Sequence, residues 1–396
     1  MKEGWRMVKL GEVCETSAGG TPSKLHKEYY ENGNIPWMLS GEVCHKYIYD
    51  VEHYITQEGL NNSSAKLFPE NTVVVAMYGA TAGQVGILKL VTSTNQAVCG
   101  ILPNDNILPE YLYYYFLYYK DLLVAQAVGN AQPNISQQKI KSVEFPFLSL
   151  EEQHRIISIL DASFEKIDAL KKNAEENLKN AKALFQQVLA QELKPKEGWV
   201  EKKLGEVCNK IVDGTHHSPT NTPEGEYPYI TAKNIKHNGI DLSNITYVTR
   251  DIHREIYLRC NPEKGDVLMI KDGATTGIAV VNDLDFEFSL LSSVALLKTK
   301  TEILEPYYLC YVLNSPNIYN QFRNKMDGAA ITRITLVKIK DAVIWVPPLD
   351  QQKNIVATLD TLSEKCHRLE QVAQQTIREC DALKQSILRQ AFSGEL

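Results

Sequence analysis

The side chains best suited to binding chemistry in this chain are the hydrogen-bonding groups of short polar loops. Gln132 and Asn134 carry amides, and Arg333 carries a guanidinium. Each of these groups can form two hydrogen bonds to a single partner. Two glycine-bounded loops, Gly79–Gly83 and Gly273–Gly277, add hydroxyls and open backbone. These residues therefore indicate recognition of a polar partner, with solvated loops or turn contacts as the alternative.

No spacing in the sequence predicts a catalytic site. The Gly79–Gly83 loop lacks the lysine of a phosphate-binding loop, and no glycine-rich cofactor fingerprint follows a strand. No pair of carboxylates is spaced for acid–base work. His216 and His217 are adjacent, so their side chains diverge on most backbones, and we expect loop residues rather than metal ligands. The sequence thus predicts no catalytic residue, no metal and no cofactor.

The composition is that of a globular protein. Of 396 residues, 44% are hydrophobic and 23% are charged, which is enough for two or three domains. No apolar run approaches the roughly 18 residues of a membrane span, and the N-terminus lacks the apolar stretch of a signal peptide. We therefore expect a cytoplasmic protein without membrane contact. None of the eight cysteines forms a C-x-x-C pair, so buried reduced thiols are expected.

The charge balance limits how the chain could bind nucleic acid. The formal net charge is −6, and no segment is basic. Phosphate contact normally draws on a surplus of lysine and arginine. If the chain binds DNA, phosphate contact must depend on a local patch or on partner subunits.

The chain is a tandem repeat of two units. The stretch Gly4–Cys14 recurs as Gly198–Cys208, and Gly79–Gly83 recurs as Gly273–Gly277, both 194 positions later. The stretch 129–136 matches 328–335, where the offset has risen to 199. Five residues were therefore gained in the second copy between about 277 and 328. A period near 195 is too long for a solenoid and predicts a duplicated domain.

Each unit is predicted to consist of a mixed α/β (α+β) globular domain followed by a long helix. The β-branched runs 72–77 and 266–270 are typical of buried strands, and 35–37 and 227–230 are further strand candidates. A helix is predicted over 109–126, and its tyrosines are expected in the core rather than as a base-stacking surface. The predicted segments are domain one (1–148), helix one (149–195), domain two (196–347) and helix two (348–396).

The two long helices carry matching heptad patterns. Apolar or small residues alternate at steps of four and three for more than four heptads, which is typical of a coiled coil. Chain connectivity favours antiparallel pairing, with the two domains at opposite ends of a two-helix spacer and Leu396 back near Met1. The predicted contact positions are Ile156, Leu160, Ser163, Ile167, Leu170, Ala174, Asn177, Ala181, Leu184 and Val188 in helix one, and Ile355, Leu359, Leu362, Cys366, Leu369, Ala373, Thr376, Cys380, Leu383 and Ile387 in helix two.

The order of the motifs resembles that of a type I restriction–modification specificity subunit. The resemblance rests on the Trp5…Leu10-Gly11-Glu12 opening, on 19–23, 35–37, 79–83 and 129–136, on the Pro-Leu-x-x-Gln helix start at 348–352, and on the closing stretch 383–394. It covers essentially the whole chain in both copies. The second copy departs from it at 213–217 and 331–333.

The resemblance implies two target recognition domains that read the two halves of a split, asymmetric DNA sequence. The helical spacer would set the gap and dock two methyltransferase subunits, and a restriction and motor subunit would join for cleavage. Since glutamine and asparagine suit adenine and arginine suits guanine, Gln132, Asn134 and Arg333 are the candidate base readers. The other candidate DNA-binding residues are Lys24, Ser40, Tyr78, Thr81, Lys233, Asn234, Lys271, Thr275 and Thr276. The alternative is a two-lobed protein–protein adaptor without DNA contact.

Overall fold

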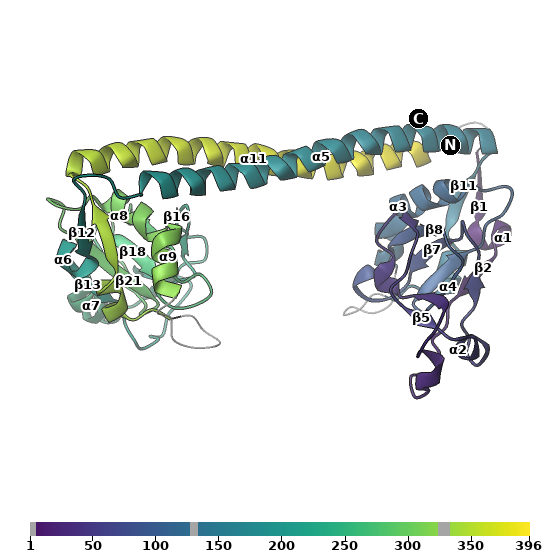
Figure 1. The fold of residues 1–396 in the computed structure, drawn as a ribbon, viewed down its shortest axis with the longest axis horizontal. Helices are drawn as coiled ribbons and strands as arrows, with labels where there is room; N and C mark the ends of the chain where they lie inside the picture. The colour runs from purple at the N-terminus through teal and green to yellow at the C-terminus, as the bar shows by residue number, and fades with distance from the viewer. Residues whose placement is uncertain (1–4, 127–133, 324–332) are drawn as a thin grey trace. The chain divides into compact units, whose positions relative to one another are not determined.

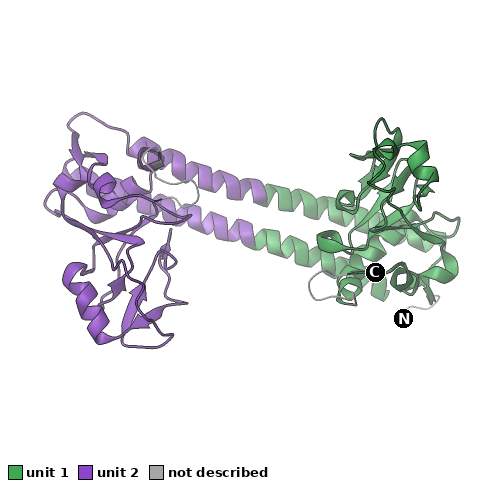
Figure 2. Cartoon of the chain, turned by 90° about the horizontal axis from the view of Figure 1, so that it is seen from below, with its two compact units in different colours: residues 1–174, 375–396 green, residues 175–374 purple. Residues whose placement is uncertain are grey.

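The computed structural model describes residues 5–126, 134–323 and 333–396, and the chain divides into two compact units (Figure 2). Unit 1 comprises residues 1–174 and 375–396, and unit 2 comprises residues 175–374. Each unit holds one globular body and one half of each long helix, α5 (Leu150–Glu192) and α11 (Leu349–Ser393). The mixed α/β class, the duplication and the two long helices are as predicted. Within the described ranges, no helix is both long and apolar enough to cross a membrane.

The body of unit 1 is built on a five-stranded sheet in the order β2-β10-β7-β8-β4. Figure 1 labels β2, β7 and β8 of this sheet. Its pairs are antiparallel except β4–β8. These strands are β2 (Thr16–Ala18), β4 (Tyr47–Ile48), β7 (Val73–Ala76), β8 (Val85–Leu88) and β10 (Val98–Ile101). A second sheet, in the order β5-β3-β9-β6, consists of β3 (Ile35–Met38), β5 (Tyr54–Ile55), β6 (Leu67–Phe68) and β9 (Thr92–Thr94).

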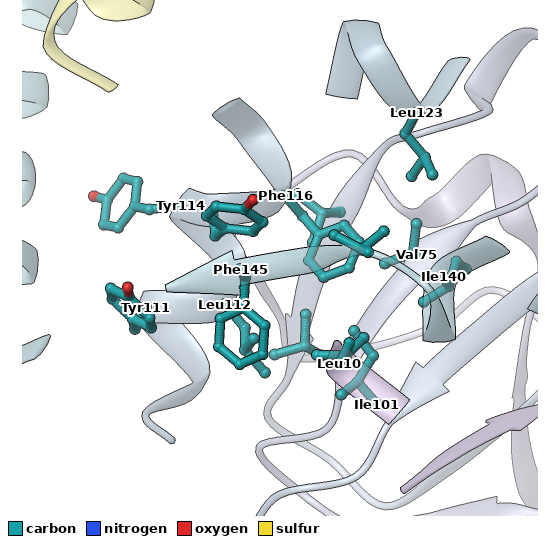
Figure 3. Packing of buried hydrophobic residues seen from close by; sticks show 14 of the residues in the cluster. Leu10, Val75, Ile101, Tyr111, Leu112, Tyr114, Phe116, Leu123, Ile140 and Phe145 are labelled. Atoms are coloured by element: carbon teal, nitrogen blue, oxygen red, sulfur yellow. The ribbon is translucent and has the colours of Figure 1, made fainter. Parts of the chain in front are cut away.

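Helix α3 (Pro109–Ala125) covers the central sheet of unit 1 and supplies much of its core (Figure 3). Tyr111, Tyr114 and Tyr115 are buried there, and the Tyr111 hydroxyl donates to the carbonyl of Pro146 at 2.7 Å. The tyrosine-rich stretch is therefore core, as predicted. The remaining elements are β1 (Arg6–Lys9), which pairs with β11 (Glu144–Phe147), and the short helices α1 (Leu10–Val13), α2 (Gln57–Asn61) and α4 (Gln137–Lys141).

Unit 2 repeats this plan. Its central sheet has the order β13-β21-β18-β19, which matches β2-β10-β7-β8. These strands are β13 (Cys208–Asp213), β18 (Val267–Ile270), β19 (Ala279–Val281) and β21 (Val294–Thr299). The smaller sheets contain β12 (Val200–Lys203) with β22 (Val343–Val346), β14 (Tyr227–Ile230) with β17 (Thr246–Val248) and β20 (Ser289–Leu290), and β15 (Ile235–Lys236) with β16 (Gly239–Ile240).

The counterpart of α3 in unit 2 is broken into α8 (Pro306–Leu313) and α9 (Pro316–Arg323). Proline has no amide hydrogen and disfavours a helical residue before it, so Pro316 ends one helix and starts the next. The hydroxyl of Tyr308 still donates to the carbonyl of Trp345, as Tyr111 does in unit 1. The other helices are α6 (Leu204–Val207), α7 (Arg250–Arg259) and α10 (Leu336–Lys340).

Strand register locates part of the five-residue gain. Ala76 pairs with Val98, whereas its counterpart Ile270 pairs with Val294. The offset has thus grown from 194 to 196 before β21. The hydroxyl of Tyr308 makes the same contact as that of Tyr111, so the offset between the two copies has reached 197 by α8. The other two residues were gained between Tyr308 and Arg333.

A buried glutamine ties each long helix to its globular body. The side chain of Gln153 accepts a hydrogen bond from the Leu108 amide and donates to two backbone carbonyls. Gln352 makes the same three contacts in unit 2: it accepts from the Glu305 amide at 2.8 Å and donates to the carbonyls of Ile303 and Pro347 at 2.8 and 2.7 Å. Both side chains are fully buried. The first turn of each long helix is therefore fixed to its body by the same cradle.

Within each unit the two helices pack in opposite directions, as predicted. In unit 1, Lys171 pairs with Asp381 at 2.6 Å and Asp168 pairs with Lys384, so residue numbers rise along α5 as they fall along α11. In unit 2, the end of α5 at Leu189 packs in one cluster with the start of α11 at Leu359.

The contact positions predicted for the two long helices form a seam of two rows on each helix, and the prediction is correct for about half of them. The buried residues of the first row are Leu160, Ile167, Ala174 and Ala181 in α5, and Leu359, Cys366, Ala373 and Cys380 in α11. Ile156 and Ile355, at the body ends of the helices, are also buried, and Leu362 is half-buried. Ser163 and Thr376 are half-buried as well, but Asn177 is exposed, and four leucines of the second row need correction because they are 45–54% exposed: Leu170, Leu184, Leu369 and Leu383. The half-buried row lies one residue later, at Lys171, Leu178 and Phe185 in α5.

The C-terminus returns to unit 1, as expected. Leu396 packs against the same core as Trp5, and its carbonyl accepts a hydrogen bond from Arg155 at 2.9 Å. Met1 lies outside the described residues. All eight cysteines are free, and burial raises the pKa of Cys99 and Cys208 to about 12.

Candidate nucleic-acid interface

In unit 1, the loop after β7 meets the segment that precedes α4. Tyr78 forms a β-bridge with Asn134, and the Ile135 amide donates to the carbonyl of Met77 at 2.9 Å. Tyr78 and Asn134 are exposed, and the half-buried Thr81 donates its hydroxyl to the carbonyl of Tyr78. Three predicted site residues therefore gather at the end of β7. Gln132 lies outside the described residues.

Lys24 and Ser40 lie on neighbouring loops of unit 1. Lys24 is exposed in a turn, and Ser40 opens the short 3-10 helix Ser40–Glu42. The Asn95 amide donates to the carbonyl of Met38 at 2.9 Å, which joins the segment before Ser40 to the end of β9. No hydrogen bond among the described residues links Lys24 or Ser40 to Tyr78 or Asn134.

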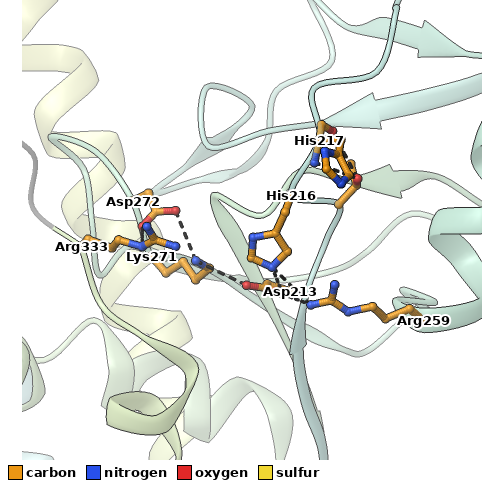
Figure 4. Close-up of polar contacts among 8 residues, drawn as sticks. Asp213, His216, His217, Arg259, Lys271, Asp272 and Arg333 are labelled. Atoms are coloured by element: carbon orange, nitrogen blue, oxygen red, sulfur yellow. Dashed lines mark hydrogen bonds and ion pairs between the residues drawn. The ribbon is translucent and has the colours of Figure 1, made fainter.

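In unit 2, the corresponding place holds a row of alternating charges (Figure 4). From one end, Arg333 faces Asp272, whose other oxygen lies 3.2 Å from the ammonium of Lys271. Lys271 reaches Asp213 at 3.4 Å, and Asp213 pairs with Arg259 at the other end. The row thus presents an arginine at each end and buries its middle.

The middle of this row is held inside the protein by mutual pairing. Lys271 is 1% exposed and Asp213 is 2% exposed. An unpaired charge at such depth would be strongly disfavoured, so each group depends on the other. Asp213 also lies 3.3 Å from Nε2 of His216. The arrangement fixes the loop after β18 to the end of β13.

The other predicted residues of unit 2 divide into exposed and buried groups. Lys233 and Thr275 are exposed. Asn234 is buried, accepts from the Thr231 amide at 3.0 Å and donates to the carbonyl of Asp241 at 3.1 Å. Thr276 is also buried, with its hydroxyl donating to the Gly273 carbonyl at 2.6 Å. Asn234, Thr276 and Lys271 are buried, and the hydrogen bonds and ion pairs described for them lie within unit 2.

Sequence reasoning missed three members of the charged row. Arg259 belongs to α7, far from the other members in sequence, and no motif pointed to it. Asp213 was noticed only as part of the departure at 213–217 from the first copy, and Asp272 was not noticed. The available signal was Lys271 itself, since a lysine inside an apolar strand needs a carboxylate nearby.

The two copies differ at this place in a consistent way. Lys271 corresponds to Met77, which is buried in the apolar core of unit 1 and makes the matching backbone contacts. By strand register, Asp213 corresponds to Ala18: Ala18 pairs with Cys99, and Asp213 pairs with the equivalent residue Ala295. Unit 1 therefore carries an alanine where unit 2 carries the buried carboxylate. At the bridged positions, the same scaffold carries a phenol and an amide in one copy and a carboxylate and a guanidinium in the other.

Nothing in the described part of the chain gathers three or more histidine, cysteine, aspartate or glutamate side chains in a way that could hold a metal ion. His216 contacts Asp213 and Arg259, and His217 is exposed in the same loop.

Comparisons with known proteins give a consistent result. A family model described as "Type I restriction modification DNA specificity domain" matches residues 2–180 and again residues 196–379. The type I restriction enzyme MjaIX specificity subunit of Methanocaldococcus jannaschii is 26% identical over 99% of this chain and 93% of its own length. The EcoR124I/EcoR124II specificity subunit of Escherichia coli is 33% identical over 43% of this chain and 42% of its own length.

Solved structures share the fold. A chain from a study of complex assembly and conformational transition in the type I R–M system has a TM-score of 0.81 at 24% identity and covers 100% of this chain and 99% of its own. The HsdS subunit of Thermoanaerobacter tengcongensis has a TM-score of 0.58 at 21% identity and covers 100% and 98%.

Proposed function

Because the chain belongs to the family defined by the type I restriction–modification DNA specificity domain, we propose that it selects the DNA sequence on which a type I restriction–modification complex acts. One observation supports this most directly. Two copies of one scaffold present different side chains at equivalent positions: Tyr78 and Asn134 in unit 1 correspond to Asp272 and Arg333 in unit 2. Different hydrogen-bonding groups on the same scaffold suit the reading of two different half-sites.

We propose that each unit reads one half of a bipartite target in double-stranded DNA. Base edges in the major groove offer distinct donor and acceptor patterns, which short polar loops can match. Since the loops of the two units differ in chemistry, the two half-sites differ and the target is asymmetric. Lys24 and Ser40 of unit 1 and Lys233 of unit 2, which are exposed or half-exposed, are proposed as additional contacts to bases or phosphates.

We propose that α5 and α11 set the number of base pairs between the half-sites. Each helix is continuous and belongs partly to unit 1 and partly to unit 2. At about 1.5 Å per residue, the 43 residues of α5 span about 65 Å. The buried glutamine cradles support this role, because they hold each recognition body rigidly against the start of a helix.

The chemical steps are assigned to partner subunits: methyl transfer to methyltransferase subunits and cleavage to a restriction and motor subunit. The relatives are described as specificity subunits, which supports a selecting rather than a reacting role for this chain. The net charge of −6 supports a division of labour in which partners supply much of the phosphate contact.

We propose that the four exposed leucines dock two copies of the methyltransferase subunit. Unit 1 exposes Leu170 and Leu383, and unit 2 exposes the equivalent pair Leu369 and Leu184. Each unit thus offers one leucine from each helix, at heptad positions next to the seam. Exposed apolar side chains at repeated positions are typical of an interaction surface.

Replacing Leu170 and Leu383 together by serine should remove one methyltransferase copy from the complex and leave the other bound. The substituted side chains are exposed, so stability should change by less than about 0.5 kcal/mol. Mass photometry of the reconstituted complex measures the stoichiometry, and the Leu184→Ser/Leu369→Ser variant should lose the other copy. Two bound copies in both variants would contradict the docking proposal.

The experiment that tests the function compares genome-wide maps of methylated adenine in strains with and without this chain, with the methyltransferase subunit present in both. We expect a split, asymmetric motif that is methylated only when the chain is present. Unchanged methylation in its absence would favour a protein–protein adaptor.

A further inference from the structure

We infer that unit 2 reads a guanine through Arg333, and that Asp272 is the positioning residue that holds this arginine in place. The inference rests on the proposed DNA-reading function and deepens it. It assigns a base and an orienting mechanism to one half-site, which neither the family nor the duplication supplies.

Arg333 is both fixed and accessible. Its backbone forms a β-bridge with Asp272, and the next amide, that of Ile334, donates to the carbonyl of Lys271 at 2.9 Å. Its side chain is 56% exposed, and its Nε lies 3.3 Å from Oδ1 of Asp272. The guanidinium is therefore in ion-pair contact with Asp272 on the side of its Nε, without hydrogen-bond geometry, and more than half of the side chain is exposed.

Asp272 is itself held from beneath. Its Oδ2 lies 3.2 Å from Nζ of Lys271, whose side chain is buried and paired on its other side with Asp213. A surface aspartate would pair with an arginine only loosely, because both side chains would lose rotational freedom. Here the buried lysine restricts the aspartate, and the aspartate in turn restricts the arginine.

An arginine held in this way suits a base edge better than a phosphate. The two terminal nitrogens of a guanidinium form a planar donor pair that matches O6 and N7 of guanine. The adjacent carboxylate offsets the positive charge, which weakens the attraction to phosphate while leaving the donor geometry intact. Within residues 5–126, 134–323 and 333–396, no hydrogen bond is made through those two terminal nitrogens.

The first copy provides the contrast. At the places of Arg333, Asp272 and Lys271, unit 1 has Asn134, Tyr78 and Met77. Met77 is part of the apolar core, so there is no buried cation under Tyr78 to orient a carboxylate. The arginine supported by a carboxylate and a buried lysine is thus a property of unit 2, and it predicts a guanine in the half-site that unit 2 reads.

The test uses the complete chain with its methyltransferase subunits and four variants: Arg333→Gln, Arg333→Lys, Asp272→Asn and the double variant Arg333→Gln/Asp272→Asn. Arg368→Gln is the matched control, because Arg368 is an exposed arginine of unit 2 that pairs with a carboxylate, Glu364, on α11. Methylated motifs are mapped in a host without other adenine methylation. Binding is measured on duplexes carrying each of the four base pairs at every position of the motif.

For the unchanged complex we expect a guanine at one position of one half-site. Arg333→Gln should lower the preference for that guanine by roughly tenfold or more and leave every other position unchanged. Arg333→Lys should retain part of the preference. Asp272→Asn should weaken it by less than Arg333→Gln does, and the double variant should match Arg333→Gln, because Asp272 acts only through the arginine.

The proposal is overturned if Arg333→Gln keeps the guanine preference, or if it weakens binding equally at all sequences, as loss of a phosphate contact would. Additive effects of Arg333→Gln and Asp272→Asn would overturn the positioning role. Arg368→Gln should leave the motif unchanged. Failure of the proposed function gives a different result, since the unchanged complex would then yield no motif that depends on this chain.

Discussion

Replacing Lys271 by methionine should lower the stability of unit 2 by about 3 kcal/mol, even though methionine is the residue that the first copy carries at this place. The substitution leaves the carboxylate of Asp213, which is 2% exposed, without its buried cation. Arg259 remains as a partner on the other oxygen, so the loss should lie near the lower end of what breaking a buried ion pair costs. Hydrogen exchange at β18 and β21 should become faster by about two orders of magnitude.

The matched variant is Lys271→Met/Asp213→Asn, which removes both buried charges. Asparagine keeps the shape and can still accept from Arg259. It should restore at least half of the lost stability, because replacing a complete buried pair by neutral groups is often close to neutral. Exchange in unit 1 serves as the internal reference. A single variant as stable as the unchanged chain would show that the pair does not hold the loop after β18.

Replacing Gln352 by leucine should destabilise unit 2 by about 2–4 kcal/mol. The leucine fills similar space but leaves the Glu305 amide and the carbonyls of Ile303 and Pro347 buried without their partner. The damage should concentrate where α11 meets its body, at the start of α8. Hydrogen exchange of α8 and of the first turns of α11 measures it.

Because the chain is duplicated, the equivalent substitution can be made in unit 1. Gln153→Leu should give a loss of the same size in unit 1, since the same three contacts are broken there. Gln186→Leu, an exposed position on α5 in unit 2, is the control and should change stability by less than about 0.5 kcal/mol. Equal stability of the Gln352→Leu variant and this control would show that the three hydrogen bonds of Gln352 do not stabilise unit 2.

The order of elements could be predicted because local patterns determine it. The β-branched run before Gly79 makes a strand on any reasonable packing, and proline at 109 starts a helix. The duplication then fixed the expected fold of the second half from the first. Antiparallel helix pairing followed from chain connectivity, which leaves few alternatives for two helices of this length.

The second row of the seam could not be predicted, since apolar residues occupy two neighbouring positions. Leu184 and Phe185 compete for one place, and both satisfy a heptad count. Small residues in the first row, such as Ala174 and Ala181, let the helices approach closely and decide which neighbour is covered. At positions 170 and 171, the half-buried residue is Lys171 and not Leu170. The aliphatic part of the lysine side chain packs between the helices, and its ammonium pairs with Asp381.

The charged row of unit 2 was beyond sequence reasoning for a different reason. Its members come from β13, the loop after β18, α7 and the segment before α10, and only tertiary packing brings them together. Burial was also not predictable from the sequence. Asn234 and Thr276 have the chemistry of base readers, but both are buried and form hydrogen bonds that close turns.

One measurement tests the central claim, which is independent reading by two look-alike domains. Residues 196–347 are exchanged for those of a relative with a different target, and the methylated motif of the chimeric complex is mapped. The account predicts that one half of the motif changes, while the other half and the number of base pairs between them stay the same. Changes in both halves, or none in either, would contradict it.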